Sequence, residues 1–263
     1  MTRLFVSDVH LDTASPPAVE QFLEFLRTEA ASAQALYILG DLFETWIGDD
    51  EAEPAKERVQ TALRALTNGG VACFILHGNR DFLLGRDFCR RTGSRLLADP
   101  IVIELDGERV LITHGDALCT DDHSYQELRT IVRNAAWQRK FLSLPLTDRE
   151  RLANSARAGS KQHTSNTTYR IMDVNPDAVT AAFRVARVRR IIHGHTHRPA
   201  VHELSIEGEP AQRIVLGSWY ESGSYLAYHD GRYELRELPR PGSPNAAGTT
   251  SAAGKTSAGG RTN

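Results

Sequence analysis

The sequence has little of what marks membrane-spanning, nucleic-acid-binding or disulfide-stabilised proteins. No apolar run in its 263 residues approaches the about 20 residues that a membrane-spanning helix needs. The formal net charge is −2, so no excess of basic residues favours a nucleic-acid partner. The three cysteines, Cys73, Cys89 and Cys119, form no Cys-x-x-Cys pair. This odd count predicts reduced thiols that pack as small apolar side chains.

The two ends of the sequence differ in character. Residues 1–6 (MTRLFV) lead directly into a strand-like run without a signal-peptide pattern, so we expect a protein of the cytoplasm. From Pro239 onward the chain consists mainly of Pro, Gly, Ser, Ala and Thr. Such a composition predicts a disordered tail over 239–263, after a single domain over 1–238.

Apolar runs alternate with amphipathic segments through the first part of the chain. Strand-like runs at 4–6, 35–39 and 71–76 each end in a polar loop, and apolar residues at helical spacing lie between them. This alternation predicts βαβ units, a largely parallel sheet and an α/β fold. Ligands of such sheets bind beyond the carboxyl ends of the strands, which is where the polar loops gather.

Two Asp-Gly dipeptides predict hairpins later in the chain. Asp106-Gly107 and Asp230-Gly231 each separate two strand-like runs, and Asp-Gly favours a tight two-residue turn. A helix beginning at Asn175-Pro176 precedes a strand at 190–192, and a further strand is expected at 213–216. The hairpin strands are expected at 101–105, 109–113, 225–228 and 233–235.

Helical signals dominate between residues 122 and about 170, where no strand pattern occurs. Asp122 is placed to cap a first helix, and Thr147 with Glu150 matches a capping box for a further one. We therefore expect a helical cap inserted into the domain. An unusually apolar patch surrounds Pro145, and from the residues alone it is more typical of helix–helix core than of a ligand groove. Its members are Trp137, Phe141, Leu142, Leu144 and Leu146.

Seven polar residues at the predicted strand ends are suited to binding metal ions. His195 and His197 follow the apolar pair Ile191-Ile192, and their spacing lets both imidazoles face one centre. Other strand ends supply carboxylate, amide and imidazole groups. The full set is Asp8, His10, Asp41, Asn79, His114, His195 and His197.

This donor set favours two metal ions. Oxygen and nitrogen ligands without thiolate suit Mn²⁺, Fe²⁺ or a similar ion better than structural zinc. Two ions about 3.5–4 Å apart that share one carboxylate account for all seven ligands. The glycines beside the ligands are expected to let the backbone turn sharply: Gly40, Gly78, Gly115 and Gly194. Structural roles are expected for the flanking histidines His77, His123, His163, His193 and His202.

The order of five short motifs resembles the calcineurin-like metallophosphoesterases. The motifs are Asp8-Val9-His10, Gly40-Asp41, Gly78-Asn79-Arg80-Asp81, His114-Gly115-Asp116 and Gly194-His195-Thr196-His197. The resemblance covers the chain from Leu4 to about Trp219. It implies a β-sandwich flanked by helices and a two-metal site bridged by Asp41. The implied ligands are Asp8, His10 and His197 for one ion, and Asn79, His114 and His195 for the other.

Arg80 stands where many members of that superfamily have a histidine that is thought to protonate an alkoxide leaving group. Arginine keeps its proton at ordinary pH, but its guanidinium can pair with phosphate oxygens at two points. A phosphate monoester has a second pKa of about 6 and needs little protonation to leave. We therefore expect cleavage of a pyrophosphate bond, with His195 as an alternative acid.

Longer segments resemble one branch of the superfamily, the family of UDP-2,3-diacylglucosamine hydrolases of lipid A biosynthesis. The matching segments include 36–44 (LYILGDLFE), 77–85 (HGNRDFLLG) and 193–202 (HGHTHRPAVH). The resemblance implies that water activated by two Mn²⁺, or other divalent ions, attacks the α-phosphate and releases UMP and 2,3-diacylglucosamine 1-phosphate (lipid X). It also implies peripheral association with the cytoplasmic face of a bacterial inner membrane, without an obligate protein partner.

The same resemblance implies individual roles at the site. Catalytic roles fall to Asp41, Arg80 and His195, and substrate contacts to Asn79, Arg80, Asp122, Ser160, Thr164 and His195. The apolar patch of the insertion becomes a place for two acyl chains. Thr164 and Thr167 stand where family members carry Asn and Lys. Thr167 lacks a cation, and Lys161 is a candidate to replace it.

Two other interpretations remain open. One is another nucleoside-diphosphate-sugar or phosphodiester hydrolase on the same scaffold, and Arg80 with the apolar insertion argues against a cyclic-nucleotide phosphodiesterase. The other is a non-catalytic scaffold. A scaffold is expected to have lost metal ligands, whereas all seven are present here.

Overall fold

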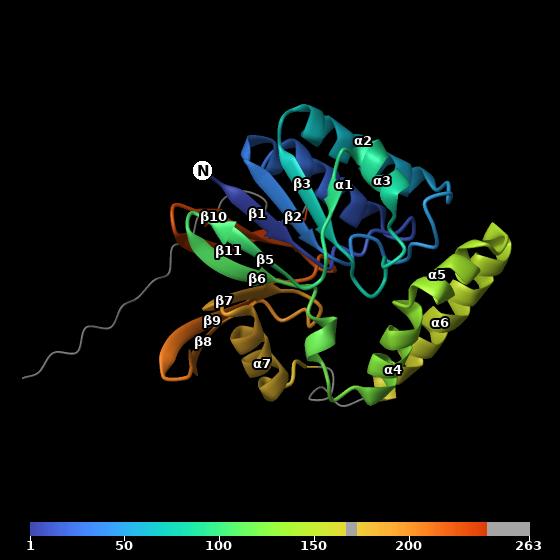
Figure 1. Cartoon of the computed structure of the whole chain (residues 1–263). Helices are drawn as coiled ribbons and strands as arrows, with labels where there is room; N and C mark the ends of the chain where they lie inside the picture. Colours follow the sequence, from blue (N-terminus) through green and yellow to red (C-terminus); the bar gives the residue numbers. More distant parts are fainter. Residues whose placement is uncertain (167–172, 241–263) are drawn as a thin grey trace, which may run out of the picture.

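Two β-sheets face each other and helices cover their outer sides in the computed structural model (Figure 1). The structure describes residues 1–166 and 173–240, without the side chains of 160–166, so nearly all of the predicted tail over 239–263 lies outside it. Across the first sheet, the described strands are β11 (Arg232–Leu238), β10 (Gly223–His229), β1 (Arg3–Val6), β2 (Ala35–Leu39), β3 (Ala72–Leu76) and β4 (Arg95–Leu96). Across the second, they are β5 (Ile101–Leu105), β6 (Glu108–Ile112), β7 (Arg190–His193), β9 (Glu209–Val215) and β8 (Ala200–Ile206).

Both faces of the first sheet are buried around β2, whose five residues are all apolar and all buried. Leu4 and Val6 of β1 join the core beneath the helices, whereas Phe5 between them joins the core shared with the second sheet. The outer face is covered by α1 (Pro16–Arg27), α2 (Pro54–Asn68) and α3 (Arg86–Thr92), which lie above β1 to β3 in Figure 1. Alternation along each strand thus separates two apolar layers.

The second sheet has its own helical cover. Phe183 of α7 (Pro176–Ala186) packs in one cluster with Leu111 and Ile191 on the outer face of this sheet. Ile112 and Ile192 point the other way, into the core between the sheets. The α/β sandwich flanked by helices is therefore confirmed. The parallel sheet predicted from the first βαβ units is confirmed for β1 to β4, and the predicted hairpins are antiparallel. The antiparallel pairs of β1 with β10 and of β8 with β9 were not predicted.

The two predicted hairpins are present, and a third was not predicted. Leu105 pairs with Glu108 across Asp106-Gly107, and both turn residues have positive φ, 50° and 92°. His229 pairs with Arg232 across Asp230-Gly231 in the same way. The third turn is Glu207-Gly208, which joins β8 to β9 with φ of 58° and 81°. It carries no Asp-Gly or Asn-Gly signal, so the sequence did not reveal it.

The insertion forms three helices that stand away from the sandwich, at the right of Figure 1: α4 (His123–Val132), α5 (Ala135–Leu142) and α6 (Leu146–Asn166). Asp122 caps α4 as predicted, because its Oδ1 accepts a hydrogen bond from the backbone of Tyr125 at 3.0 Å. The capping box at Thr147 is wrong. The carbonyl of Pro145 already accepts hydrogen bonds from the amides of Asp148 and Arg149, so α6 begins two residues earlier than predicted.

Most of the apolar patch of the insertion docks this segment onto the domain. The rings of Trp137 and Phe141 stack with centroids 5.1 Å apart, and Trp137 also meets Phe82 at 6.2 Å. Phe141 is buried, whereas Leu142 is 40 % exposed. Two short 3₁₀ turns, Ala30–Ser32 and Asp116–Leu118, complete the described elements. Among the helices of the described ranges, none has the apolar length that crossing a bilayer requires.

The three thiols agree with the expectation from the sequence. Cys73 and Cys119 are buried, Cys89 is half-buried, and none of the three forms a disulfide. Burial raises the pKa of both Cys73 and Cys119 to about 12, so these thiols stay protonated and unreactive.

Candidate metal centre

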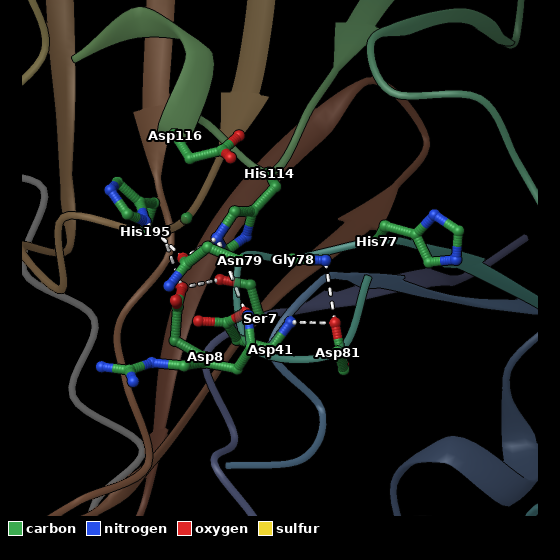
Figure 2. Close-up of polar contacts among 12 residues, drawn as sticks. Ser7, Asp8, Asp41, His77, Gly78, Asn79, Asp81, His114, Asp116 and His195 are labelled. Atoms are coloured by element: carbon green, nitrogen blue, oxygen red, sulfur yellow. Dashed lines mark hydrogen bonds and ion pairs between the residues drawn. The ribbon is translucent and has the colours of Figure 1, made fainter. Parts of the chain in front are cut away.

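All seven predicted ligands follow the carboxyl ends of strands, and the two sheets bring these ends together. The loops after β1, β2 and β3 supply residues from the first sheet, and the loops after β6 and β7 supply residues from the second. Figure 2 shows Asp8, Asp41, Asn79, His114 and His195 converging at one place. The sandwich therefore creates a site that neither sheet forms by itself.

One half of the centre contains Asp8, His10 and His197. The Nε2 atoms of the two histidines lie 3.3 Å apart, and Asp8 Oδ1 lies 3.2 Å from that of His197 and 3.8 Å from that of His10. Asp8 is fully buried, yet Oδ1 has no hydrogen-bond partner among the described residues. A buried carboxylate oxygen between two imidazole nitrogens is suited to a cation, because an unpaired buried anion is otherwise costly.

The other half contains Asn79, His114 and His195. Asn79 Oδ1 lies 2.9 Å from His114 Nε2 and 2.9 Å from His195 Nδ1. Asp41 lies between the halves, with Oδ1 3.8 Å from His114 Nε2 and Oδ2 3.8 Å from His10 Nε2. The two oxygens of this one carboxylate thus face opposite halves, as a bridging ligand requires.

The backbone at this centre is unusual. Within the described ranges, nine non-glycine residues have positive φ, and five of them belong to the predicted ligand set. Such a backbone is uncommon for residues with a Cβ and clusters at functional sites. The five are Asp8, His10, Asp41, His195 and His197, with φ between 52° and 66°.

The four glycines beside the ligands serve two purposes. Gly40 and Gly115 have φ of 88° and 112°, so they make sharp turns as predicted. Gly78 and Gly194 do not, and for them the prediction was wrong. A Cβ on Gly78 would lie 2.0 Å from Asp41 Oδ1, and one on Gly194 would lie 1.8 Å from Ser7 Oγ. These two glycines allow close approach of neighbouring loops.

Hydrogen bonds between loops hold the ligands beyond the ends of the strands. The amides of Asp8 and His10 donate to the carbonyls of Gly40 and Asp41 at 3.1 and 3.0 Å. The fully buried Asp81 accepts from the amides of Gly78 and Asp41, at 2.8 and 3.2 Å (Figure 2). Asp81 belongs to the motif Gly78-Asn79-Arg80-Asp81, but the sequence analysis gave it no role.

Close packing of charges shifts the pKa values of the ligands. Burial would raise the pKa of Asp8, but His197, His114 and His10 hold it below its usual value. Burial dominates at Asp41 and raises its pKa. Burial would lower the pKa of His114, but Asp41 and Asp8 raise it to about 9. Burial and the charge of His114 lower the pKa of His195 to about 4. A bound cation favours the deprotonated form of every ligand.

Sequence reasoning missed two residues that surround His10. Glu44 Oε2 lies 2.9 Å from His10 Nδ1, and the ring of Tyr220 stacks on the imidazole with centroids 4.9 Å apart. Tyr220 also meets His197 edge-on at 5.4 Å and is 51 % exposed. Glu44 is the last residue of the segment 36–44 that resembles the hydrolase family, but nothing in the sequence pairs it with His10.

A third missed residue, Asp116, connects the centre to the insertion. Its buried Oδ2 accepts from Tyr125 Oη at 2.5 Å and from Arg129 Nε at 2.8 Å, both on α4. Arg133, the residue after α4, donates to the carbonyl of Gly78 at 2.9 Å. The first helix of the insertion is thus fastened to the loops that carry His114 and Asn79.

The other predicted site residues lie as follows. The amide of Arg80 donates to Asp41 Oδ1 at 2.8 Å. Asp122 caps α4 at the edge of the insertion. The side chains of Ser160, Lys161, His163 and Thr164, together with all of Thr167, lie outside the described part.

Two of the histidines that were expected to be structural have partners in the protein. His77 Nε2 donates to the carbonyl of Leu84 at 2.7 Å, and Arg213 donates to Nε2 of the buried His193 at 3.0 Å. His123 begins α4, and His202 lies on β8, away from the strand ends that carry the seven ligands.

Comparisons with known proteins agree with this geometry. The model of the calcineurin-like phosphoesterase family matches residues 1–199. UDP-2,3-diacylglucosamine hydrolase of Salmonella typhi is 51% identical over 239 residues, which is 91% of this chain and 100% of that protein. The hydrolase of the same name from Enterobacter sp. (strain 638) is 50% identical with the same coverage.

A solved archaeal phosphodiesterase aligns with a TM-score of 0.48 and 13% identity, covering 90% of this chain and 100% of that one. The family model spans most of the chain, and the curated relatives are about half identical along their whole length. The chain is therefore a member of the calcineurin-like phosphoesterase family, and the curated relatives named above are hydrolases.

Proposed function

We propose that this protein hydrolyses the pyrophosphate bond of UDP-2,3-diacylglucosamine, giving UMP and 2,3-diacylglucosamine 1-phosphate. The observation that carries the proposal is a two-part metal centre with an apolar helical insertion fastened beside it. A diphosphate bearing acyl chains has the two matching parts, one anionic and one apolar. Relatives of that name align over their whole length, which supports the same substrate.

Two Mn²⁺ ions, or other divalent ions, fit the residues of the centre. Asp8, His10 and His197 would hold one ion, and the other would lie at Asn79, His114 and His195, with Asp41 shared. The orphaned buried Oδ1 of Asp8 supports this assignment. When bound, two divalent ions supply a water of lowered pKa and positive charge for the phosphoryl oxygens.

The chain itself contributes orientation and charge. The amide of Arg80 holds Asp41 in place, and its guanidinium would pair with phosphate oxygens. The pKa of His195, lowered to about 4, keeps this imidazole neutral at pH 7. A neutral imidazole favours the role of ligand over that of proton donor. A phosphate leaving group needs no strong acid, so this assignment of roles is consistent with a pyrophosphate substrate.

The insertion would bind the lipid part of the substrate. The exposed Leu142 and the half-buried Trp137, which lies against Phe82, would provide apolar surface for it, and the buried Phe141 supports Trp137 from behind. Asp122, Ser160 and Thr164 would contact the glucosamine phosphate. Such a substrate resides in a membrane, so the protein would work peripherally at the cytoplasmic face of a bacterial inner membrane.

Release of UMP from UDP-2,3-diacylglucosamine with added Mn²⁺ tests the proposal. We expect rapid, Mn²⁺-dependent release that Asp41→Ala reduces by about a thousandfold, since several kcal/mol of charge stabilisation are lost. The deacylated nucleotide sugar should be a poor substrate. Equal turnover of both nucleotide sugars, or cleavage of a generic phosphodiester alone, would refute the proposed substrate but not the proposed metal centre.

A non-catalytic scaffold makes a different prediction for the same samples. A scaffold would bind no Mn²⁺ and would turn over none of these substrates. Titration calorimetry with Mn²⁺ on the full chain separates this outcome from a wrong substrate, because it reports on the centre without any turnover.

A further inference from the structure

Glu44 lies between the metal centre and the helical insertion and contacts both. Its Oε2 is 2.9 Å from His10 Nδ1. Its Oε1 accepts a hydrogen bond at 3.3 Å from Arg157 Nη2, on α6. Residues 44 and 157 are 113 positions apart in the chain, and neither belongs to the seven ligands. One carboxylate therefore joins a metal ligand to the longest helix of the insertion.

The position of Glu44 is fixed by the domain. Its amide donates to the carbonyl of Leu11 at 3.1 Å, which extends the pairing of the loops after β1 and β2. Its side chain is 13 % exposed. Oε2 and His10 Nδ1 lie close to each other, but neither atom makes a hydrogen bond of good geometry to any described residue.

We propose that Glu44 is a positioning residue that orients His10 toward the metal and holds α6 through Arg157, so that metal binding and the position of this helix are coupled. The inference rests on the proposed metal centre. A carboxylate on one imidazole nitrogen fixes the ring and makes the other nitrogen a better ligand. A metal that fixes His10 also fixes Glu44, and with it the partner of Arg157. Coupling of this kind acts equally in both directions.

The start of α6 is anchored independently. Arg149 is buried, donates to the carbonyl of Ile47 at 2.8 Å and forms an ion pair with Asp50. These contacts involve no metal ligand. Further along the helix, Arg157 reaches Glu44 and, at 3.4 Å, Asp12. Metal binding should therefore steady the segment around Arg157 and leave the first turn around Arg149 unchanged, which provides a control within one helix.

Hydrogen exchange of the full-length protein, with and without Mn²⁺, tests the inference. In the wild type we expect Mn²⁺ to slow amide exchange over 153–159 by about five- to tenfold, at the low end of measured couplings between sites, and to leave 146–150 unchanged. Arg157→Gln should bind Mn²⁺ but lose the slowing at 153–159. Arg151→Gln is the matched control, because Arg151 is exposed on the same helix and pairs only with Asp148 among the described residues.

Glu44→Gln adds a second readout. By calorimetry we expect Mn²⁺ binding about 10–100-fold weaker, as for other residues that orient a metal-bound histidine. At saturating Mn²⁺ this variant should also lack the slowing over 153–159. Unchanged Mn²⁺ affinity in Glu44→Gln, or a Mn²⁺ effect on 153–159 that persists in Arg157→Gln, overturns the inference. A wild type that binds no Mn²⁺ at all refutes the proposed metal centre instead.

Discussion

The two halves of the proposed metal centre orient their histidines by different means. His114 Nδ1 donates to the carbonyl of Leu39 at 2.9 Å, so the backbone at the end of β2 sets the direction of this imidazole. His10 Nδ1 instead faces the side chain of Glu44. A backbone carbonyl is present whatever the sequence, whereas a glutamate is one mutation from being lost. The half around His114 is thus set by the fold, and the half around His10 depends on particular side chains.

The insertion touches both halves, again in different ways. Asp116 and Arg133 fasten α4 beside His114 and Asn79, and Asp116 is completely buried. Glu44 and Arg157 join α6 to His10, and the side chain of Arg157 is 29 % exposed. The contact with α4 is therefore the firmer one. Substitutions at the contact with α4 and at the contact with α6 should therefore differ in their effects.

Among substitutions outside the seven predicted ligands, the largest effect is expected from Gly78→Ala, which acts on both halves at once. The added Cβ would lie 2.0 Å from Asp41 Oδ1 and 2.2 Å from the amide of Asp41, so the shared carboxylate must move. A displacement of about 1 Å costs on the order of a hundredfold in rate, and we expect kcat/KM to fall at least that far.

Gly159→Ala on α6 is the matched control for Gly78→Ala, because nothing lies within 4 Å of its added Cβ. It should keep full activity and gain a little helix stability. Comparable loss of kcat/KM in both variants would show that the crowding at Asp41 is not the cause.

An intermediate effect is expected from Asp116→Asn, which weakens the contact between the loop after β6 and α4. The substitution removes the charge that faces Arg129 and Arg133. In the wild type, burial would raise the pKa of Asp116, but His114, His195 and the two arginines hold it below its usual value. We expect unfolding free energy to fall by about 1–3 kcal/mol in thermal melts, as for a buried charged hydrogen bond. KM for the acylated substrate should rise about tenfold, with Mn²⁺ affinity little changed. A loss of Mn²⁺ affinity without a change in KM would contradict this assignment.

The smallest effect is expected at Tyr220, in the half of the centre around His10. Tyr220→Ala removes the ring stacked on His10, and aromatic pairs contribute about 0.5–1.5 kcal/mol. Mn²⁺ affinity should fall by roughly two- to tenfold by calorimetry. Tyr220→Phe keeps the ring and should bind Mn²⁺ like the wild type. If both variants weaken binding equally, the hydroxyl and not the stacking is responsible.

The sequence predicted what lies close together along the chain. Strand ends followed by polar residues gave all seven converging side chains, and Asp106-Gly107 gave a hairpin with the right turn. Those signals are local, since a strand, its exit loop and its turn occupy a few consecutive residues. The family resemblance then supplied the sandwich, which local patterns had read as a mainly parallel sheet.

Contacts between distant segments remained invisible. Glu44 meets His10 and Arg157 only because the loops after β1 and β2 pair and the insertion folds back. Nothing in the spacing of Tyr220 indicated a ring above His10. The start of α6 was misplaced because Thr147 and Glu150 satisfy a capping pattern that the carbonyl of Pro145 makes unnecessary.

The left-handed backbone at five of the proposed ligands matters to anyone who wants to move this centre into another protein. Each such residue costs about 1 kcal/mol relative to an ordinary conformation, so five approach the lower end of the total stability of a domain. Glycine would relieve the cost but would remove the ligand. A graft that copies seven side chains onto a relaxed scaffold would therefore point them in the wrong directions. The surrounding sandwich, with its hydrogen-bonded loops, has to be transplanted as well.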